Sequence, residues 1–478
     1  MIHLTDFLTL LPELILAFGA MVALLAGAFC GPRATRVLSA FLVALMAAAL
    51  AAVLTGGDQT AFGGAFATDG FTRFAKALVL GAAALAIVTA DDFFVREKRL
   101  AFEYPVLIAL ATLGMLVMVS AADFLTLYLG LELQSLSLYV LAAFDRSHRR
   151  SAEAGLKYFV LGALASGLML YGISLVYGYA GATGYQAVAG ALKASGVSIG
   201  LVFGLVFLIA GLAFKISAVP FHMWAPDVYE GAPTPVVAFF ATAAKVAAMA
   251  MVVRAMLVPF ADALHQWQQV IVAVSVLSMA LGAVAGVGQK NIKRLMAYSS
   301  IGHMGYALLG LAAGTALGVQ GVLIYLFFYA VSNVGAFVCI QAMRRGGAKV
   351  EAISDLAGLS RTHPKAAFAF AALLFSLAGL PPLMGIFAKV YVFLAAIAAH
   401  LYIAATLGVV ASCIAAYYYI NVVKVMYLDE PADAPLELAM SGGLKAILWA
   451  TAMVSILFVF LPGPLVQVAG AAAGALVP

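Results

Sequence analysis

Four ionisable side chains lie inside long apolar runs of this sequence. They are Glu132, Lys215, Lys245 and Lys389. A charge at the centre of a lipid-embedded helix costs roughly 2.5–3.5 kcal/mol on insertion scales, so such groups face protein or water and mark ion paths. Burial weakens the hold of an ammonium group on its proton, and a nearby carboxylate strengthens it again. Three lysines with one glutamate therefore predict a proton relay; static ion pairs and snorkelling side chains are the alternatives.

Prolines interrupt two of these apolar runs. Pro220 has no N–H to donate to the carbonyl of Ile216, and Pro381 and Pro382 free further carbonyls, including that of Ala378. Each break lies close in sequence to one of the four charged residues. Irregular backbone at membrane depth is tolerated where it lines a cavity. We therefore expect both breaks to lie on the ion path; simple kinks in the two helices are the alternative.

Four further residues are secondary candidates for the relay. Glu153 and Lys157 are spaced i,i+4, which fits a surface ion pair or a relay step. His222 follows the first break and either passes protons to the lysine before it or ends the broken helix. His303 fits a relay group and a satisfied core histidine equally. Glu13 also lies in an apolar run and has no evident partner in the sequence.

Composition defines the elements that must position these residues. Of 478 residues, 65% are hydrophobic and 10% are charged, whereas soluble proteins carry about a quarter charged residues. A soluble fold is therefore excluded. The apolar runs are continuous rather than alternating, which excludes a barrel. The net charge of +5 is small and scattered, so nucleic acid is not an expected partner. The three cysteines stand alone, so no disulfide, zinc or iron–sulfur site is expected.

The apolar runs predict an all-α polytopic membrane protein with about fourteen transmembrane helices. The predicted runs are 8–29, 36–55, 70–90, 104–121, 122–143, 156–180, 199–218, 235–258, 268–288, 297–313, 319–342, 366–389, 398–428 and 443–466. Nearly all loop lysines and arginines follow odd-numbered helices, and such residues accumulate in cytoplasmic loops. Both termini are therefore expected on the periplasmic side of a bacterial inner (plasma) membrane; a mitochondrial inner membrane is less favoured.

The two interrupted runs, helices 7 and 12, suggest an internal repeat. They are five helices apart, which fits inverted five-helix repeats formed by helices 4–8 and 9–13, because an odd repeat length reverses the orientation of the second copy. The predicted divisions are 1–103 for the first three helices, 104–258 and 259–428 for the repeats, and 429–478 for a loop and the last helix.

Four segments carry a resemblance that spans essentially the whole chain. They are GLELQSL at 130–136, KISAVPFHMWAPDVYEGAPTP at 215–235, KRLMAYSSIGHMG at 293–305 and GLPPLMGIFAK at 379–389. With these segments the sequence resembles the antiporter-like membrane subunits of respiratory complex I, the proton-translocating NADH:quinone oxidoreductase. The resemblance implies that Glu132 and Lys215 form a pair, that Lys245 is the central relay group and that Lys389 lies on the exit side.

The resemblance also implies the partners of the chain. FMN, iron–sulfur clusters and quinone are expected on partner subunits, with no cofactor on this chain, which would serve the enzyme as a non-redox subunit. Other membrane-arm subunits and the lipid bilayer are the expected partners, and a homo-oligomer is not expected. Two other functions stay open: a subunit of a multi-component Na⁺(K⁺)/H⁺ antiporter, which shares similar motifs, and a passive scaffold of a membrane assembly.

Overall fold

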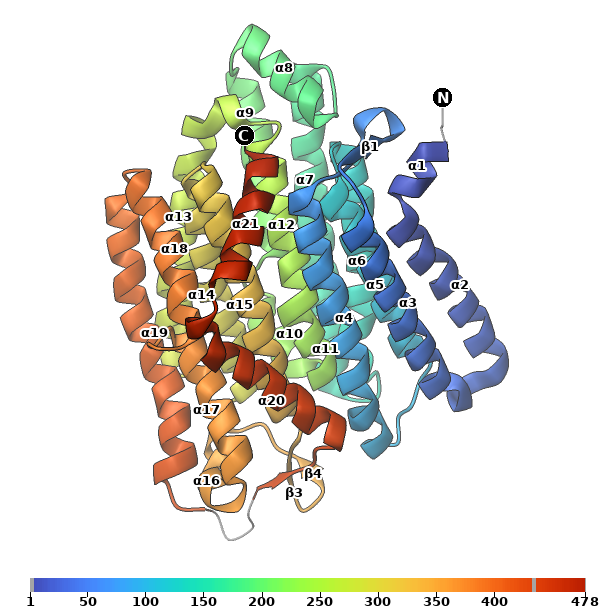
Figure 1. Cartoon of the computed structure of the whole chain (residues 1–478), viewed down its shortest axis with the longest axis vertical. Coiled ribbons are helices and arrows are strands. Elements are labelled where there is room, and N and C mark those ends of the chain that lie inside the picture. The colour runs from blue at the N-terminus through green and yellow to red at the C-terminus, as the bar shows by residue number, and fades with distance from the viewer. Residues whose placement is uncertain (1–3, 432–435, 478) are drawn as a thin grey trace.

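The computed structural model describes residues 4–431 and 436–477, and its long helices stand side by side in one bundle (Figure 1). The first half comprises α1 (Leu4–Thr9), α2 (Leu11–Cys30), the 3₁₀ turn η1 (Gly31–Ala34), α3 (Thr35–Thr55), α4 (Gly70–Arg96), α5 (Glu103–Ser120), α6 (Phe124–Ala142), α7 (Arg149–Ala180), α8 (Tyr185–Ser195), α9 (Ile199–Lys215), α10 (Ala225–Gly231), α11 (Thr234–Phe239) and α12 (Lys245–Leu257). The second half comprises η4 (Ala261–Ala263), α13 (Leu264–Val287), α14 (Ile292–Ala312), α15 (Ala316–Gln341), α16 (Leu359–Thr362), α17 (Pro364–Ala378), α18 (Met384–Ala398), α19 (Tyr402–Leu428), α20 (Gly442–Leu457) and α21 (Gly463–Leu476).

The predicted class, an all-helical polytopic membrane protein, is confirmed. Within the described ranges, ten helical stretches are long and apolar enough to cross a membrane, and four shorter apolar helices accompany them. One of the ten, Leu11–Thr55, contains two of the predicted helices. Every predicted apolar run coincides with a helix or a pair of helices. The division into two inverted repeats stays a prediction.

Polar side chains determine where several of the helices begin. In each case a side-chain oxygen accepts a hydrogen bond from a backbone N–H of the first turn, which would otherwise have no partner within the helix. These capping residues are Asp69 for α4, Asp123 for α6, Ser198 for α9, Asn291 for α14, Thr315 for α15 and Ser441 for α20. The caps explain why short joins suffice between neighbouring apolar helices.

Two helices are interrupted where the prolines predicted it. α9 ends at Lys215 and the chain resumes a helix at α10, while α17 ends at Ala378 and α18 begins at Met384. The second interrupted helix is longer than predicted: the predicted run 366–389 stops at Lys389, but α18 carries this lysine inside and continues to Ala398. A buried charge does not end a helix when its partners lie within the protein.

The helix that carries Lys245 contains an irregular turn. A π-helical segment, η3 (Phe240–Ala244), separates α11 from α12, so the hydrogen bonds widen to i→i+5 immediately before the lysine. Nearly every residue from 234 to 257 is buried. This helix therefore lies at the centre of the bundle, between the two interrupted helices along the chain.

Several short elements carry no signal in the apolar pattern. They are α1, α8, α10 and α16, the 3₁₀ turns η2 (Phe62–Gly64), η5 (Ile353–Leu356) and η6 (Phe458–Phe460), and the strands β1 (Gln59–Ala61), β2 (Phe66–Thr68), β3 (Met343–Arg345), β4 (Ala348–Lys349) and β5 (Glu437–Leu438). The helix α21 is apolar, but the predicted run 443–466 ends near its beginning. β1 pairs with β2, and β3 pairs with both β4 and β5, in antiparallel register. The sheets lie at opposite ends of the bundle (Figure 1).

The loops that follow the odd-numbered helices of the predicted series, among them those after α4, α6 and α15, meet at one end of the bundle, which we call the cationic end. Ion pairs join Arg99 to Asp145 and Arg344 to Glu97, and β3 pairs with β5. The other loops meet at the opposite end, where Arg254 pairs with Asp69. The alternation of loop charge in the sequence therefore corresponds to two distinct ends of the folded bundle.

Glycines let the helices of three pairs, α5–α6, α7–α9 and α13–α14, approach closely. A Cβ added at Gly114 of α5 would lie 2.5 Å from the backbone nitrogen of Gln134 on α6, and one at Gly172 of α7 would lie 2.5 Å from that of Leu208 on α9. In α13, a Cβ at Gly282 would lie 2.6 Å from the nitrogen of Gly302 on α14. Small residues at such interfaces are typical of membrane helix pairs.

Candidate functional site

Glu132 lies on α6, facing α7. Its side chain is half-buried, and its carboxylate accepts a hydrogen bond from the hydroxyl of Ser166 on α7. Lys215, at the C-terminal end of α9, is 7% exposed and donates to the hydroxyl of Ser135 at 2.6 Å and to that of Tyr139 at 3.4 Å. Ser135 lies nearly one turn beyond Glu132 on the same helix.

Lys215, on α9, thus contacts the same helix, α6, that carries Glu132. Among the described residues the two side chains form no direct ion pair within 4 Å. A hydroxyl from α6 stands on the lysine side, and another from α7 stands on the carboxylate side. The geometry places the two groups as neighbours with a hydroxyl between their helices rather than as a locked ion pair.

Lys245 reaches the first helix interruption. Its ammonium group is 2% exposed and donates to the carbonyl of Ile216 at 2.7 Å and to the hydroxyl of Ser217 at 2.6 Å. The ammonium also lies 5.5 Å from the centre of the Trp224 ring. The carbonyl of Ile216 is the one that Pro220 leaves without a helical partner. A relay lysine therefore satisfies a backbone group that the break exposes.

Lys389 occupies the matching position at the second interruption. It is 3% exposed and donates to the carbonyl of Ala378 at 2.7 Å and to the hydroxyl of Ser412 on α19 at 2.6 Å. Gly379 follows that carbonyl with φ of +81°, and a Cβ there would lie 2.8 Å from the lysine nitrogen. Glycine is required at this position both for its backbone conformation and to make room for the ammonium group.

His303 lies in a buried cluster of tyrosines. Nδ1 lies 2.7 Å from the hydroxyl of Tyr325 and Nε2 lies 3.1 Å from that of Tyr419. Its ring is 6.5 Å from that of Tyr306, over which Lys389 places its ammonium at 5.1 Å. His303 is therefore a hydrogen-bonded core residue with Tyr306 between its ring and Lys389, and a relay role for it stays a prediction.

His222 lies in the first interruption. Its backbone carbonyl accepts a hydrogen bond from the N–H of Ala225, at the beginning of α10. No hydrogen bond joins its imidazole to Lys215 among the described side chains. Its backbone thus leads into α10, and both predicted roles of its imidazole stay predictions.

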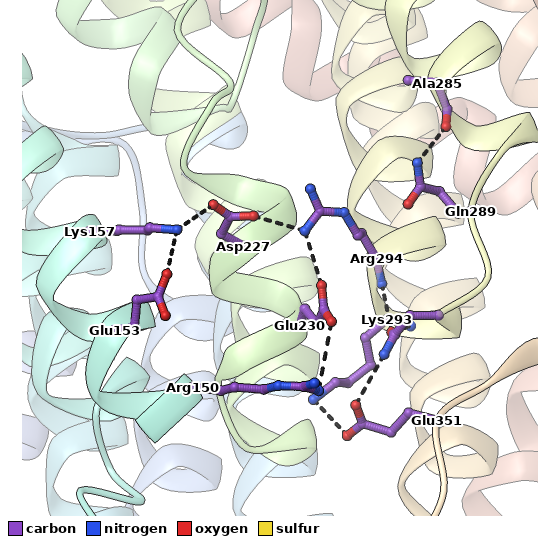
Figure 2. Close-up of polar contacts among 11 residues, drawn as sticks. Arg150, Glu153, Lys157, Asp227, Glu230, Ala285, Gln289, Lys293, Arg294 and Glu351 are labelled. Atoms are coloured by element: carbon purple, nitrogen blue, oxygen red, sulfur yellow. Dashed lines mark hydrogen bonds and ion pairs between the residues drawn. The ribbon is translucent and has the colours of Figure 1, made fainter. Parts of the chain in front are cut away.

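Glu153 and Lys157 form the predicted i,i+4 pair, and the pair belongs to a longer network across α7, α10 and α14 (Figure 2). The ion pairs run in order through Glu153, Lys157, Asp227, Arg294, Glu230 and Arg150, with N···O distances of 2.7, 2.8, 2.8, 3.0 and 3.8 Å. Beside it, Lys293 pairs with Glu351 at 2.8 Å. Helices far apart in the sequence are thus joined through alternating charges.

A cavity of about 1250 Å³ opens at the cationic end. The loops after α4, α6 and α10 and the segment 349–355 surround it, and its lining includes Arg99, Asp145, Glu230, Lys293 and Tyr139. Burial raises the pKa of Asp145, but the neighbouring guanidinium of Arg99 outweighs it and holds that pKa below its usual 3.8. Tyr139 therefore both lines the cavity and contacts the first relay lysine, Lys215, through its hydroxyl.

Two buried ion pairs are not predicted from the sequence. Glu13 on α2 pairs with Lys76 on α4 at 2.6 Å, and both side chains are almost fully buried. Arg254 on α12 pairs with Asp69 at 2.6 Å. Lys76 lies inside the predicted run 70–90, so the criterion that selected the four relay residues also selects it. Its partner comes from a different helix, and no local pattern identifies that partner.

Comparisons with known proteins identify the family that this chain resembles. A family model described as NADH:quinone oxidoreductase/Mrp antiporter, TM, matches residues 121–415. Among curated relatives, NADH-quinone oxidoreductase subunit N of Parvibaculum lavamentivorans is 56% identical over 476 residues, covering 99% of this chain and 98% of the relative. Subunit N 1 of Rhizobium meliloti is also 56% identical, over 97% of this chain and 96% of the relative.

Solved structures show the same architecture. A chain of respiratory complex I from Thermus thermophilus matches with a TM-score of 0.82 and 32% identity, covering 95% of this chain and 98% of that one. A chain of the Mrp complex from Dietzia sp. DQ12-45-1b matches with a TM-score of 0.87 at 23% identity, covering 98% and 97%. At that identity the second match concerns the fold alone.

Proposed function

We propose the function of this chain from its family: it belongs to the NADH:quinone oxidoreductase/Mrp antiporter family. It is an antiporter-like membrane subunit of NADH:quinone oxidoreductase, and its curated relatives at 53–56% identity are named subunit N. Proton translocation fits this place in the complex. The parts that follow, the residues of the relay and its direction, are our proposal.

The relay consists of Glu132, Lys215, Lys245 and Lys389. The observation that carries this assignment is the pair of contacts at the helix interruptions: Lys245 binds the free carbonyl of Ile216, and Lys389 binds that of Ala378. An ammonium group stabilises such a carbonyl, and losing its proton weakens the contact. Protonation of Lys245 and of Lys389 is thereby coupled to the arrangement of an interrupted helix.

Protons enter the relay from the cationic end, which we assign to the cytoplasm. The cavity there borders Tyr139, whose hydroxyl contacts Lys215. The lysine-rich and arginine-rich loops at this end support the assignment, because such loops stay on the cytoplasmic side. Both termini then lie on the periplasmic side of a bacterial inner membrane. His303, which Tyr306 separates from Lys389, is a secondary member of the relay. Glu153 and Lys157 belong to the ion pairs that join α7 to α10 at the cationic end.

The chain contributes no redox cofactor in this proposal. Flavin, iron–sulfur clusters and quinone lie on partner subunits, and the chain acts as a single copy among other membrane-arm subunits. The two inverted repeats of helices 4–8 and 9–13 are part of the same proposal. The two interruptions, at α9–α10 and at α17–α18, fall in predicted helices 7 and 12, which are equivalent under these repeats, and this spacing supports them.

Replacing Lys245 by methionine tests the relay. In the complete complex, reconstituted in liposomes, we expect Lys245→Met to lose most NADH-driven proton pumping, because the free carbonyl loses its proton-carrying partner. Lys193→Met, which alters an exposed lysine of α8, serves as the control. Unchanged pumping and turnover in Lys245→Met would contradict the assigned role. Co-purification with dehydrogenase subunits, rather than with antiporter subunits alone, distinguishes this function from that of an Mrp-type antiporter.

A further inference from the structure

Each of the three relay lysines donates to one serine hydroxyl at the same distance. The lysine nitrogens of residues 215, 245 and 389 lie 2.6 Å from the hydroxyls of Ser135, Ser217 and Ser412, respectively. The serines come from three different elements: α6, the interruption after α9, and α19. Hydroxyls thus stand beside every relay lysine, whereas backbone carbonyls stand beside only two of them.

A hydroxyl differs from a carbonyl in what it offers a lysine. A carbonyl only accepts, so it stabilises the ammonium form alone. A serine hydroxyl accepts from an ammonium group and, after rotating its proton, donates to a neutral amine. A lysine that gives up its proton beside a serine therefore keeps a hydrogen bond within the protein. Leaving a buried polar group unpaired is costly.

Ser135 illustrates this exchange. When Lys215 is charged, the serine oxygen accepts from the ammonium while the hydroxyl proton points to the carbonyl of Leu131, 2.5 Å away. When the lysine is neutral, the same proton can turn to the amine. The hydroxyl thus has a partner for its proton in both states.

Ser217 gives an independent indication. Its φ of +56° is in the left-handed region that favours glycine, and the residue is fully buried. Glycine would fill this position at lower conformational cost, but it would leave Lys245 without a hydroxyl. Unfavourable backbone conformations of this kind cluster at functional sites. The presence of serine rather than glycine is explained by the contact with the lysine.

We propose that Ser135, Ser217 and Ser412 are positioning residues of the relay, hydroxyls that keep each lysine hydrogen-bonded in both its charged and its neutral form. The proposal rests on the proposed function, because it assigns roles around the same lysines. It predicts that removing one hydroxyl slows proton transfer without unfolding the protein.

The sharpest test uses Ser217→Gly and Ser217→Ala in the complete reconstituted complex. Both variants remove the hydroxyl, but glycine also relieves the left-handed backbone and is expected to be the more stable of the two. We expect pumping to fall by about tenfold in both, in line with one lost hydrogen bond to a charged group. We also expect a displaced pH profile. A structural role would instead let the glycine variant pump normally and would sink the proposal.

Conservative variants complete the test. Ser135→Thr keeps the hydroxyl on a regular helix and is expected to restore the pumping that Ser135→Ala loses. Ser275→Ala is the matched control, since Ser275 is fully buried and donates only to the carbonyl of Gly305. Lys245→Met distinguishes failure of the proposed function from failure of the serine role. If Lys245→Met pumps normally, the proposed function fails; if it stops pumping while Ser217→Gly pumps normally, only the role of the serine fails.

Discussion

At the scale of single residues, Lys245 and Lys389 have the same two kinds of hydrogen-bond acceptor although they lie on different helices. Each ammonium group takes one carbonyl from an interrupted helix and one serine hydroxyl. A regular helix would use those carbonyls for itself. The interruptions therefore give the protein two backbone acceptors at membrane depth without any additional side chain. A lysine positioned beside such an acceptor is stabilised in its charged form.

The pair formed by Glu13 and Lys76 is expected to stabilise the fold and not the relay. Lys76→Met leaves a buried carboxylate unpaired, which typically costs about 3–5 kcal/mol, whereas replacing both partners by apolar residues is often neutral. We therefore expect a lower melting temperature in detergent for Lys76→Met and recovery in the double variant with Glu13→Leu. Equal melting temperatures of the single variant and the parent protein would contradict this role.

The pair formed by Asp69 and Arg254 predicts an acid-sensitive contribution to stability. Burial raises the pKa of Asp69, but Arg254 and Thr72 outweigh it, so the pKa lies below its usual 3.8. The contribution is therefore present above that value and is lost as the pH falls through the lowered pKa. We expect Arg254→Met to cost about 1.5–3 kcal/mol at neutral pH and to weaken the acid dependence of the melting temperature.

A solvent-exposed aspartate provides the comparison for this measurement. Asp58 pairs with Arg73, and its side chain is 64% exposed. Asp58→Asn should change stability by less than about 1 kcal/mol, because exposed pairs contribute little. A similar loss in both variants would show that burial does not distinguish the two pairs.

At the scale of elements, close helix pairs hold the relay residues in place. Gly114 and Gly130 join α5 to the helix of Glu132, and Gly282 joins α13 to the helix of His303. Backbone atoms, not flexible side chains, stand where the missing Cβ atoms would be. These interfaces therefore have little freedom to adjust, and the positions of the polar groups depend on them.

Gly282→Ala is expected to disturb the pair α13–α14. The new Cβ would lie 2.6 Å from the nitrogen of Gly302 and 2.7 Å from the carbonyl oxygen of Tyr298, and overpacking of this kind typically costs about 1–3 kcal/mol. We expect a lower melting temperature. Gly167→Ala, in a helix with nothing within 4 Å of the added atom, should leave stability unchanged or slightly higher.

Apolar pattern predicts the helices of this chain well, because each crossing needs one long apolar segment. The interruptions also follow from sequence, since proline removes an N–H. The partners of the buried charges do not. Lys76 was visible as a charge in an apolar run, but Glu13 lies on another helix, and Arg254 and Asp69 are still farther apart in the chain. Such pairs depend on how helices are placed beside one another, which local pattern does not encode.

At the scale of the whole molecule, charges separate the two ends of the bundle. The cationic end contains the cavity and the ion-pair network of Figure 2, which joins α7, α10 and α14. The network crosses from the first proposed repeat to the second through Asp227, which pairs with Lys157 and Arg294. Movement of α10 would therefore change ion pairs with both α7 in the first proposed repeat and α14 in the second.

Cysteine labelling can establish which end faces the cytoplasm. With Cys30, Cys339 and Cys413 replaced by alanine, one new cysteine is placed at exposed Ser147 on the cationic end or at exposed Ser195 on the opposite end. We expect a membrane-impermeant maleimide to label Ser195→Cys in spheroplasts and Ser147→Cys only in inside-out vesicles. The reverse pattern would invert the proposed orientation.

The π-helical turn before Lys245 sets the direction in which that lysine points. Each residue of an α-helix advances about 100° around its axis, so one extra residue in Phe240–Ala244 rotates everything after it by roughly that angle. The side chain is thereby aimed at the broken segment instead of at a neighbouring face. The turn therefore sets the azimuth of the lysine around the helix axis rather than its depth in the bilayer. A one-residue deletion there would take the ammonium group away from Ile216 while leaving every charge in the protein unchanged.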